Sequence, residues 1–146
     1  MRKEKIITIQ DRGQELTFKI REMSAAQLEA WLGRIAALAA GSGMQVSDIS
    51  KLGEAGTFLA EKGLAALGNI DFEEARPLLD ELLGCCSRIV ERIEERCTPE
   101  TVDNYIFDVT TLFKLRMEAI KMNLGFLLPE GESLSGSQEK VNIAGR

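Results

Sequence analysis

The stretch that first decides the fold is residues 5–21, which read KIITIQDRGQELTFKIR. Apolar and polar side chains alternate on both sides of a short polar segment, which is the pattern of two half-buried β-strands. The polar segment, residues 11–14, holds Gly13, which can adopt the positive φ that a tight hairpin turn needs. Because two strands alone are marginal in water, the sequence predicts a β-hairpin that packs on an apolar surface supplied by the rest of the chain.

After the hairpin, apolar residues recur at every third and fourth position, which is typical of amphipathic helices. Residues suited to helix N-caps precede several of these stripes. Helices are predicted within 28–39, 52–67, 78–97 and 102–124. Ser24, Asp71 and Thr98 are the expected caps of the first, third and fourth of these helices. Pro77 lies at the start of the third helix or inside it, and the fourth helix is expected to be interrupted near Asp108. The second is the least regular, because each interior glycine costs about 1 kcal/mol relative to alanine.

These patterns predict a mainly α protein of the α+β class. A single domain is expected over residues 1–128, with the β-hairpin in 1–23 packed on a bundle of about four to five helices in 24–128. Residues 129–146 are rich in glycine, serine and charged side chains and hold few apolar ones. This composition predicts a flexible C-terminal tail.

The composition excludes several classes of function. The 146-residue chain contains no histidine, which removes Ser-His and Cys-His dyads and histidine metal sites. Its net charge of −5 disfavours nucleic-acid binding. Residues 1–23 carry six basic and four acidic side chains, whereas the rest of the chain is acidic. This asymmetry leaves self-association open beside binding to another protein, although a solvated face is the commoner explanation.

The sequence also bears on the compartment. No apolar segment of signal-peptide length follows the charged N-terminus, and the longest apolar run, residues 35–40, is far shorter than the ~20 residues of a membrane span. Cys85, Cys86 and Cys97 form an odd set without a disulfide or zinc spacing, and they are expected as buried small hydrophobes. We therefore expect a cytoplasmic protein that does not associate with membranes.

No residue stands out as catalytic, cofactor-binding or metal-ligating. Residues 73–95 hold seven carboxylates that could form an acid/base pair or a cation site. The last three of them interleave with Arg88, Arg92 and Arg96 at helical spacing, which favours a solvent-facing, salt-bridged surface. The sequence holds neither GxGxxG nor a Walker-type loop. Trp31 is expected as a core anchor. The prediction is a non-enzymatic protein without cofactors.

Several segments follow one another in a recognisable order. They are the turn at 11–13, the stretch 16–25 with Trp31 after it, PLLDELL at 77–83, TLFKLR at 111–116 followed by Ile120, and NLGF at 123–126. In this order the chain, over roughly residues 4–128, resembles the small tail assembly chaperones of long-tailed bacteriophages and prophages. None of the segments is a catalytic signature, and most of their positions are apolar.

The resemblance implies a mostly helical protein of the host cytoplasm that binds the long, helical tape measure protein while the phage tail is built. Such chaperones keep the tape measure protein soluble, help tail-tube protein polymerise around it, and are absent from the finished virion. In many of these systems a programmed frameshift adds a C-terminal extension that recruits tube subunits. The polar stretch after Pro129 is compatible with such a junction.

A protein that binds amphipathic helices needs an apolar groove. The leucine-rich stretch 78–93 and the segment 109–124, which is apolar on more than one side, are the places to build one. The predicted partner-binding residues are Leu115, Met122, Leu78 and Leu82. The same side chains are also suited to a core, and the sequence does not choose between the two roles.

Two alternatives remain open. The first is a structural tail-completion or connector protein, which would stay in the virion in a fixed copy number. The second is a small enzyme or cofactor-binding protein, which would show a concave site with convergent polar groups. The missing histidine and phosphate loop make the second alternative the weakest of the three.

Overall fold

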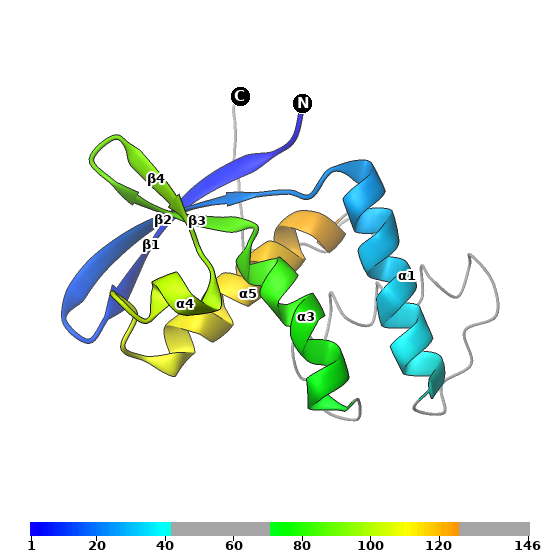
Figure 1. Cartoon of the computed structure of the whole chain (residues 1–146). Helices are drawn as coiled ribbons and strands as arrows, with labels where there is room; N and C mark the ends of the chain where they lie inside the picture. The colour runs from blue at the N-terminus through cyan, green and yellow to red at the C-terminus, as the bar shows by residue number, and fades with distance from the viewer. Residues whose placement is uncertain (42–70, 126–146) are drawn as a thin grey trace.

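The computed structural model describes residues 1–41 and 71–125. Four strands and four helices are found in these residues. In chain order they are β1 (Glu4–Asp11), β2 (Gln14–Arg21), α1 (Ala25–Gly41), α3 (Phe72–Leu83), β3 (Cys86–Val90), β4 (Ile93–Arg96), α4 (Pro99–Val102) and α5 (Val109–Leu124) (Figure 1). The predicted helix within 52–67 and the predicted tail of 129–146 lie outside the described residues.

The predicted N-terminal hairpin is confirmed. β1 and β2 pair antiparallel from Glu4 opposite Arg21 to Asp11 opposite Gln14. The two turn residues between them, Arg12 and Gly13, have φ values of 48° and 89°. Positive φ at both positions gives a turn whose twist matches that of the flanking strands.

The helix predicted to run from residue 78 to Cys97 is wrong beyond Leu83. The chain turns at Gly84 and forms a second hairpin, β3–β4, in place of the last part of that helix. β3 pairs antiparallel with β2, with Phe18 opposite Arg88 and Ile20 opposite Cys86. The edge of β2 offers unpaired backbone groups, and this long-range pairing outweighs the local helical pattern of residues 86–96.

The fold class must therefore be corrected from a mainly α bundle to a mixed α/β structure. One four-stranded antiparallel sheet has the strand order β1-β2-β3-β4. Helices make up 51% and strands 27% of the confidently placed residues, which is too much sheet for a bundle with a single hairpin. The hairpin of residues 1–23 is thus half of the sheet, and residues 24–128 do not form an all-helical unit.

The predicted helix starts are confirmed at Ser24, Asp71 and Thr98. The Ser24 hydroxyl accepts a hydrogen bond from the Gln27 backbone N–H at 3.2 Å, and Asp71 Oδ1 accepts one from the backbone N–H two residues later at 2.9 Å. Thr98 forms a capping box with Thr101 at the start of α4. Asp108, where an interruption was predicted, caps α5. Local side-chain capping thus sets where these helices begin.

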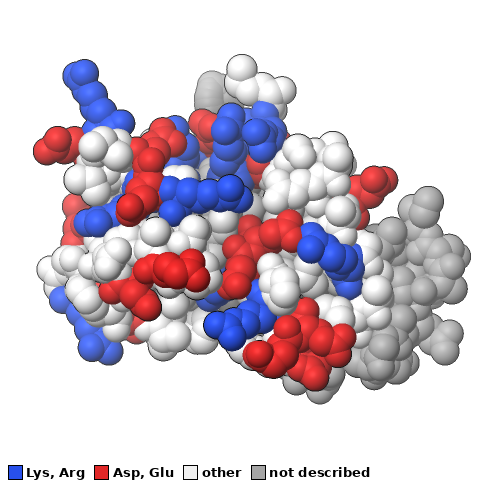
Figure 2. Space-filling view, in the orientation of Figure 1, with Lys and Arg blue, Asp and Glu red and all other residues white. Residues whose placement is uncertain are grey.

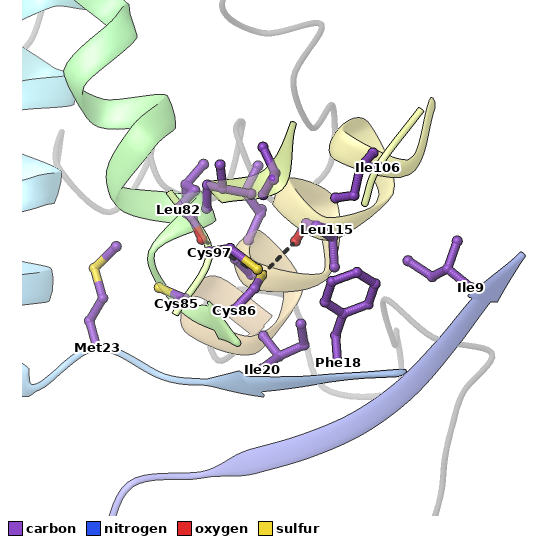
Figure 3. Close-up of a cluster of buried hydrophobic side chains, with 14 of the residues drawn as sticks. Ile9, Phe18, Ile20, Met23, Leu82, Cys85, Cys86, Cys97, Ile106 and Leu115 are labelled. Carbon is purple, nitrogen blue, oxygen red and sulfur yellow. Dashed lines mark hydrogen bonds between the residues drawn. The ribbon is translucent and has the colours of Figure 1, made fainter. Parts of the chain in front are cut away.

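The helices cover one face of the sheet. α5 contacts β1 and β2, α3 packs on α5, and α1 packs on α3, so α1 is the outermost layer (Figure 1). Phe18 and Ile20 point from β2 into the core between sheet and helices (Figure 3). The indole of Trp31 is 1% exposed, and its Nε1–H donates to the Leu78 carbonyl at 3.1 Å, which joins α1 to α3 and confirms Trp31 as a core anchor.

The three cysteines lie in the same core, as predicted. Cys85, Cys86 and Cys97 are free thiols and are buried. Cys86 lies between α3 and α5, with its Sγ 3.9 Å from the Leu82 carbonyl oxygen and 3.7 Å from that of Leu115 (Figure 3). These thiols fill space in the core as small apolar groups.

Candidate functional site

The structure places the predicted partner-binding residues in the interior. Leu78, Leu82 and Leu115 are 2%, 1% and 0% exposed, and Met122 is partly buried against the same cluster. The four side chains are thus brought together, but as part of the core between α3, α5 and the sheet. They do not form an exposed surface in this fold, so they take the core role that the sequence had left open, and partner contact through them stays a prediction.

A different set of apolar side chains is exposed at the start of α5. Phe107, Val109 and Phe113 are 57%, 56% and 50% exposed. Val109 and Phe113 are four residues apart on one helix and therefore share a face. Phe107 directly precedes the cap residue Asp108, where an apolar side chain often packs back on the first turns of the helix. We call these three residues the α5 apolar surface.

The backbone beside this surface is held by the buried side chain of Asp11. Asp11 Oδ2 accepts a hydrogen bond from the Phe107 N–H at 2.9 Å, and Oδ1 accepts bonds from the Asp108 N–H at 3.0 Å and the Thr111 hydroxyl at 2.7 Å. The carboxylate is 0% exposed. Burial acts to raise its pKa, but the hydrogen bonds from these three residues and Gln14 outweigh burial and lower the pKa to about 2. Asp11 is therefore ionised at neutral pH.

Gln14 extends this network to the loop that precedes α5. Its Nε2 group donates to Asp11 Oδ2 at 3.1 Å and to the Tyr105 carbonyl at 2.7 Å. The Tyr105 ring in turn lies under the Arg88 guanidinium, 4.3 Å from its centroid. The loop is thus fastened to both hairpins. A surface whose backbone is fixed in this way loses little conformational entropy when a partner binds.

Other exposed apolar side chains are more scattered. Val90 and Ile93 face each other at the tip of the β3–β4 hairpin and are 46% and 69% exposed. Ile6 on β1 and Phe72 at the start of α3 are 62% and 63% exposed. Neither place combines three neighbouring apolar residues with a buried network that fixes their backbone. The α5 apolar surface is accordingly the best candidate for partner contact among the described residues.

The sequence contained only part of the information needed to find this surface. Val109 and Phe113 belong to the segment 109–124, which was predicted as a place for an apolar groove, but neither was named among the predicted partner-binding residues. Phe107 carried one signal, its position next to a helix-capping aspartate. No local signal indicated the burial of Asp11, because three of its four hydrogen-bond donors lie 96 to 100 residues away in the chain.

The described residues offer little for covalent or metal chemistry. Burial raises the pKa of Cys85 to about 11 and also raises the pKa of Cys86 and Cys97, so all three are protonated at neutral pH. In residues 1–41 and 71–125, no three Asp, Glu or Cys side chains are grouped in a way that could hold a metal ion. The carboxylates of Glu91, Glu94 and Glu95 are exposed, as predicted, although they lie on a hairpin rather than a helix.

None of the described helices combines the length and apolar character that crossing a membrane requires. Comparison of the chain with models of known families, with curated proteins and with solved structures finds no match.

Proposed function

We propose that this protein is a non-enzymatic tail assembly chaperone that binds the tape measure protein in the host cytoplasm during phage tail assembly. The proposal rests on the resemblance of the sequence to that family. The structural observation that supports it is the α5 apolar surface, because half or more of each of Phe107, Val109 and Phe113 remains exposed. Side chains of this type are enriched where proteins bind one another.

The geometry of the surface suits a helical partner. Val109 and Phe113 lie one turn apart on α5, and Phe107 extends the surface beyond the end of the helix. An amphipathic helix binds through apolar side chains spaced by three, four and seven residues. A tape measure protein is a long series of such helices, and its apolar faces would be covered by copies of this chain until tail-tube protein replaces them.

Co-expression tests this function directly. The partner is the longest helix-rich open reading frame downstream of the gene, and the measurement is the fraction of it that stays soluble and co-elutes with this protein. We expect wild type to raise both, and Phe113→Glu to lower co-elution about tenfold, since exposed aromatic anchors carry much of the energy of an interface. Phe72→Glu is the matched control, because Phe72 is at least as exposed as Phe113 but lies outside the α5 apolar surface.

One outcome would contradict the chaperone function, and another would contradict only the assignment of the α5 apolar surface as its contact. If the long protein aggregates unchanged and nothing co-elutes, the chaperone function fails. If both glutamate variants co-elute as well as wild type, the function stands but the α5 apolar surface is not the contact. Mass spectrometry of purified virions separates the structural alternative, because a tail-completion or connector protein is present there in fixed copy number and a chaperone is absent.

A further inference from the structure

A cavity of about 330 Å³ lies at the end of the sheet that faces the start of α1. Its walls come from the N-terminal segment, the end of β2, the first turn of α1, the connection between α3 and β3, and the two strands that follow that connection. Figure 1 shows the N-terminal end of the chain and the first turn of α1 at this same end of the molecule. The size is within the range of small-molecule sites.

Three guanidinium groups line the cavity, those of Arg2, Arg21 and Arg96, against the single carboxylate of Glu22. Arg21 is paired with Glu4, with its Nε atom 3.0 Å from a carboxylate oxygen. When that pair is counted as neutral, two arginines face one glutamate, and an excess of one positive charge remains. Figure 2 shows a group of basic side chains beside the N-terminal end of the chain. This excess is unexpected in a chain whose net charge is −5.

The Arg96 guanidinium lies against the backbone of Gly84 at the wall of the cavity. Its Nε–H donates to the Gly84 carbonyl at 3.1 Å, which orients the guanidinium and leaves its terminal nitrogens without a hydrogen-bond partner among the described residues. A Cβ atom at Gly84 would lie only 3.1 Å from Arg96 Nη2, so a larger residue there would push the guanidinium aside. Arg2 likewise has no ion-pair or hydrogen-bond partner within 1–41 and 71–125. No described residue therefore pairs with the Arg2 guanidinium or with the terminal nitrogens of Arg96, which leaves both able to bind an anion within this part of the chain.

Neutral hydrogen-bond donors complete the lining. Ser87 contributes a hydroxyl from β3, and Gln27 contributes a side-chain amide from the first turn of α1, one N–H of which donates to Glu81 Oε2 at 3.2 Å. The N-terminus of a helix adds partial positive charge on the same side. Donors therefore surround the cavity from several elements. A carboxylate needs only one planar guanidinium fork, whereas a tetrahedral phosphate presents oxygens in several directions.

We propose that this cavity binds a phosphate group, either as the free ion or as the phosphate end of a small monoester, through Arg2 and Arg96. This site is separate from the α5 apolar surface and does not depend on the proposed function. A small phosphorylated ligand here would join the N-terminal segment to β4 and to the start of α1, three parts of the chain that are far apart in sequence.

The test is an NMR titration of the full chain with sodium phosphate, and with sodium chloride at matched ionic strength. We expect saturable shifts of the Gly84 and Ser87 amides with phosphate only. Arg2→Gln and Arg96→Gln should each raise the apparent dissociation constant about tenfold, because each removes charge-assisted hydrogen bonds. Arg76→Gln is the matched control, since Arg76 is an exposed arginine on α3 outside the cavity.

Arg2→Gln keeps the test valid if Arg96→Gln disturbs the fold, because Arg2 has no described partner to lose. The same titration with glycerol phosphate tests a phosphate monoester, and the titration with succinate tests a dicarboxylate. Binding of inorganic phosphate, glycerol phosphate or both supports the proposal and shows which form is preferred. Shifts that do not saturate, equal shifts with chloride, tighter binding of succinate, or arginine variants that behave like Arg76→Gln would each overturn it.

Discussion

The Oδ1 atom of Asp11 accepts a hydrogen bond of 2.7 Å from the Thr111 hydroxyl, and it joins the turn of the first hairpin to the first turn of α5 across 100 residues of chain. Both residues are buried. A buried carboxylate is tolerated only when its lone pairs are satisfied, and here four donors satisfy them. This contact fixes the orientation of the sheet relative to α5, and with it the backbone of the α5 apolar surface.

Replacing Asp11 with asparagine should destabilise the protein. The amide keeps one acceptor oxygen and places an NH₂ group against backbone or side-chain donors, so at least one buried donor is left unsatisfied. We expect the free energy of unfolding to fall by about 2–4 kcal/mol, measured by urea denaturation. Asp71→Asn is the control, because asparagine caps a helix as well as aspartate does and Asp71 is exposed. Equal losses in the two variants would show that the Asp11 network contributes no special stability.

The same carboxylate should make stability depend on pH in acid. The pKa of Asp11 is lowered from 3.8 to about 2, so the unfolded state binds the proton more tightly than the folded state. The resulting stabilisation is complete above about pH 5 and is lost as pH falls through 3.8 towards 2, with a total of about 2 kcal/mol. Urea denaturation at several pH values should therefore show the difference between wild type and Asp11→Asn shrinking over this window. A difference that stays constant down to pH 2 would contradict the lowered pKa.

Leu115 and Phe113 are near neighbours on α5, but substitution of Leu115 should lower stability, whereas substitution of Phe113 should weaken partner binding. Leu115 is 0% exposed, so Leu115→Ala should cost about 2–5 kcal/mol of unfolding free energy by leaving a cavity. Phe113 is 50% exposed, and Phe113→Ala should change stability by less than about 1 kcal/mol while weakening partner binding. Thermal melting and the co-elution assay measure the two effects. A Leu115 variant that melts like wild type would restore the partner-face prediction for that residue.

The sequence was sufficient to predict the features that depend on residues close together in the chain, namely the first hairpin and the helix starts. The first hairpin follows from alternation around a turn with a glycine, and Ser24, Asp71 and Thr98 cap helices through their own side chains. These signals act within a few residues of chain. The starts of these elements were predicted close to where the structure has them, whereas the helix capped by Asp71 was predicted to reach Cys97 and ends at Leu83.

The second hairpin was missed because its pairing partner lies far away in the chain. The spacing of Cys86, Ile89, Val90 and Ile93 fits a helical stripe, and the turn at residues 91–92 lacks glycine, although Glu91 adopts a φ of 58°. The choice between strand and helix depends on the edge of β2, some 65 residues earlier in the sequence, to which β3 pairs. Burial of Asp11 and of Leu115 has the same origin, since only the assembled sheet and α5 decide which side of each element is covered.

The rates at which the three cysteines react with a thiol reagent should show how accessible the core and the proposed phosphate cavity are. At pH 8, a thiol with a pKa of about 11 is ionised to about one part in a thousand, so native Cys85 should react with a thiol reagent far more slowly than in urea. Cys85 is nevertheless 8% exposed and lines the cavity, whereas Cys86 and Cys97 are 0% and 1% exposed. We therefore expect mass spectrometry to find label first on Cys85, and Cys85→Ser to reduce native labelling to the rate of unfolding. Earlier labelling of Cys97 would show that the β4 end of the core opens more readily than the cavity.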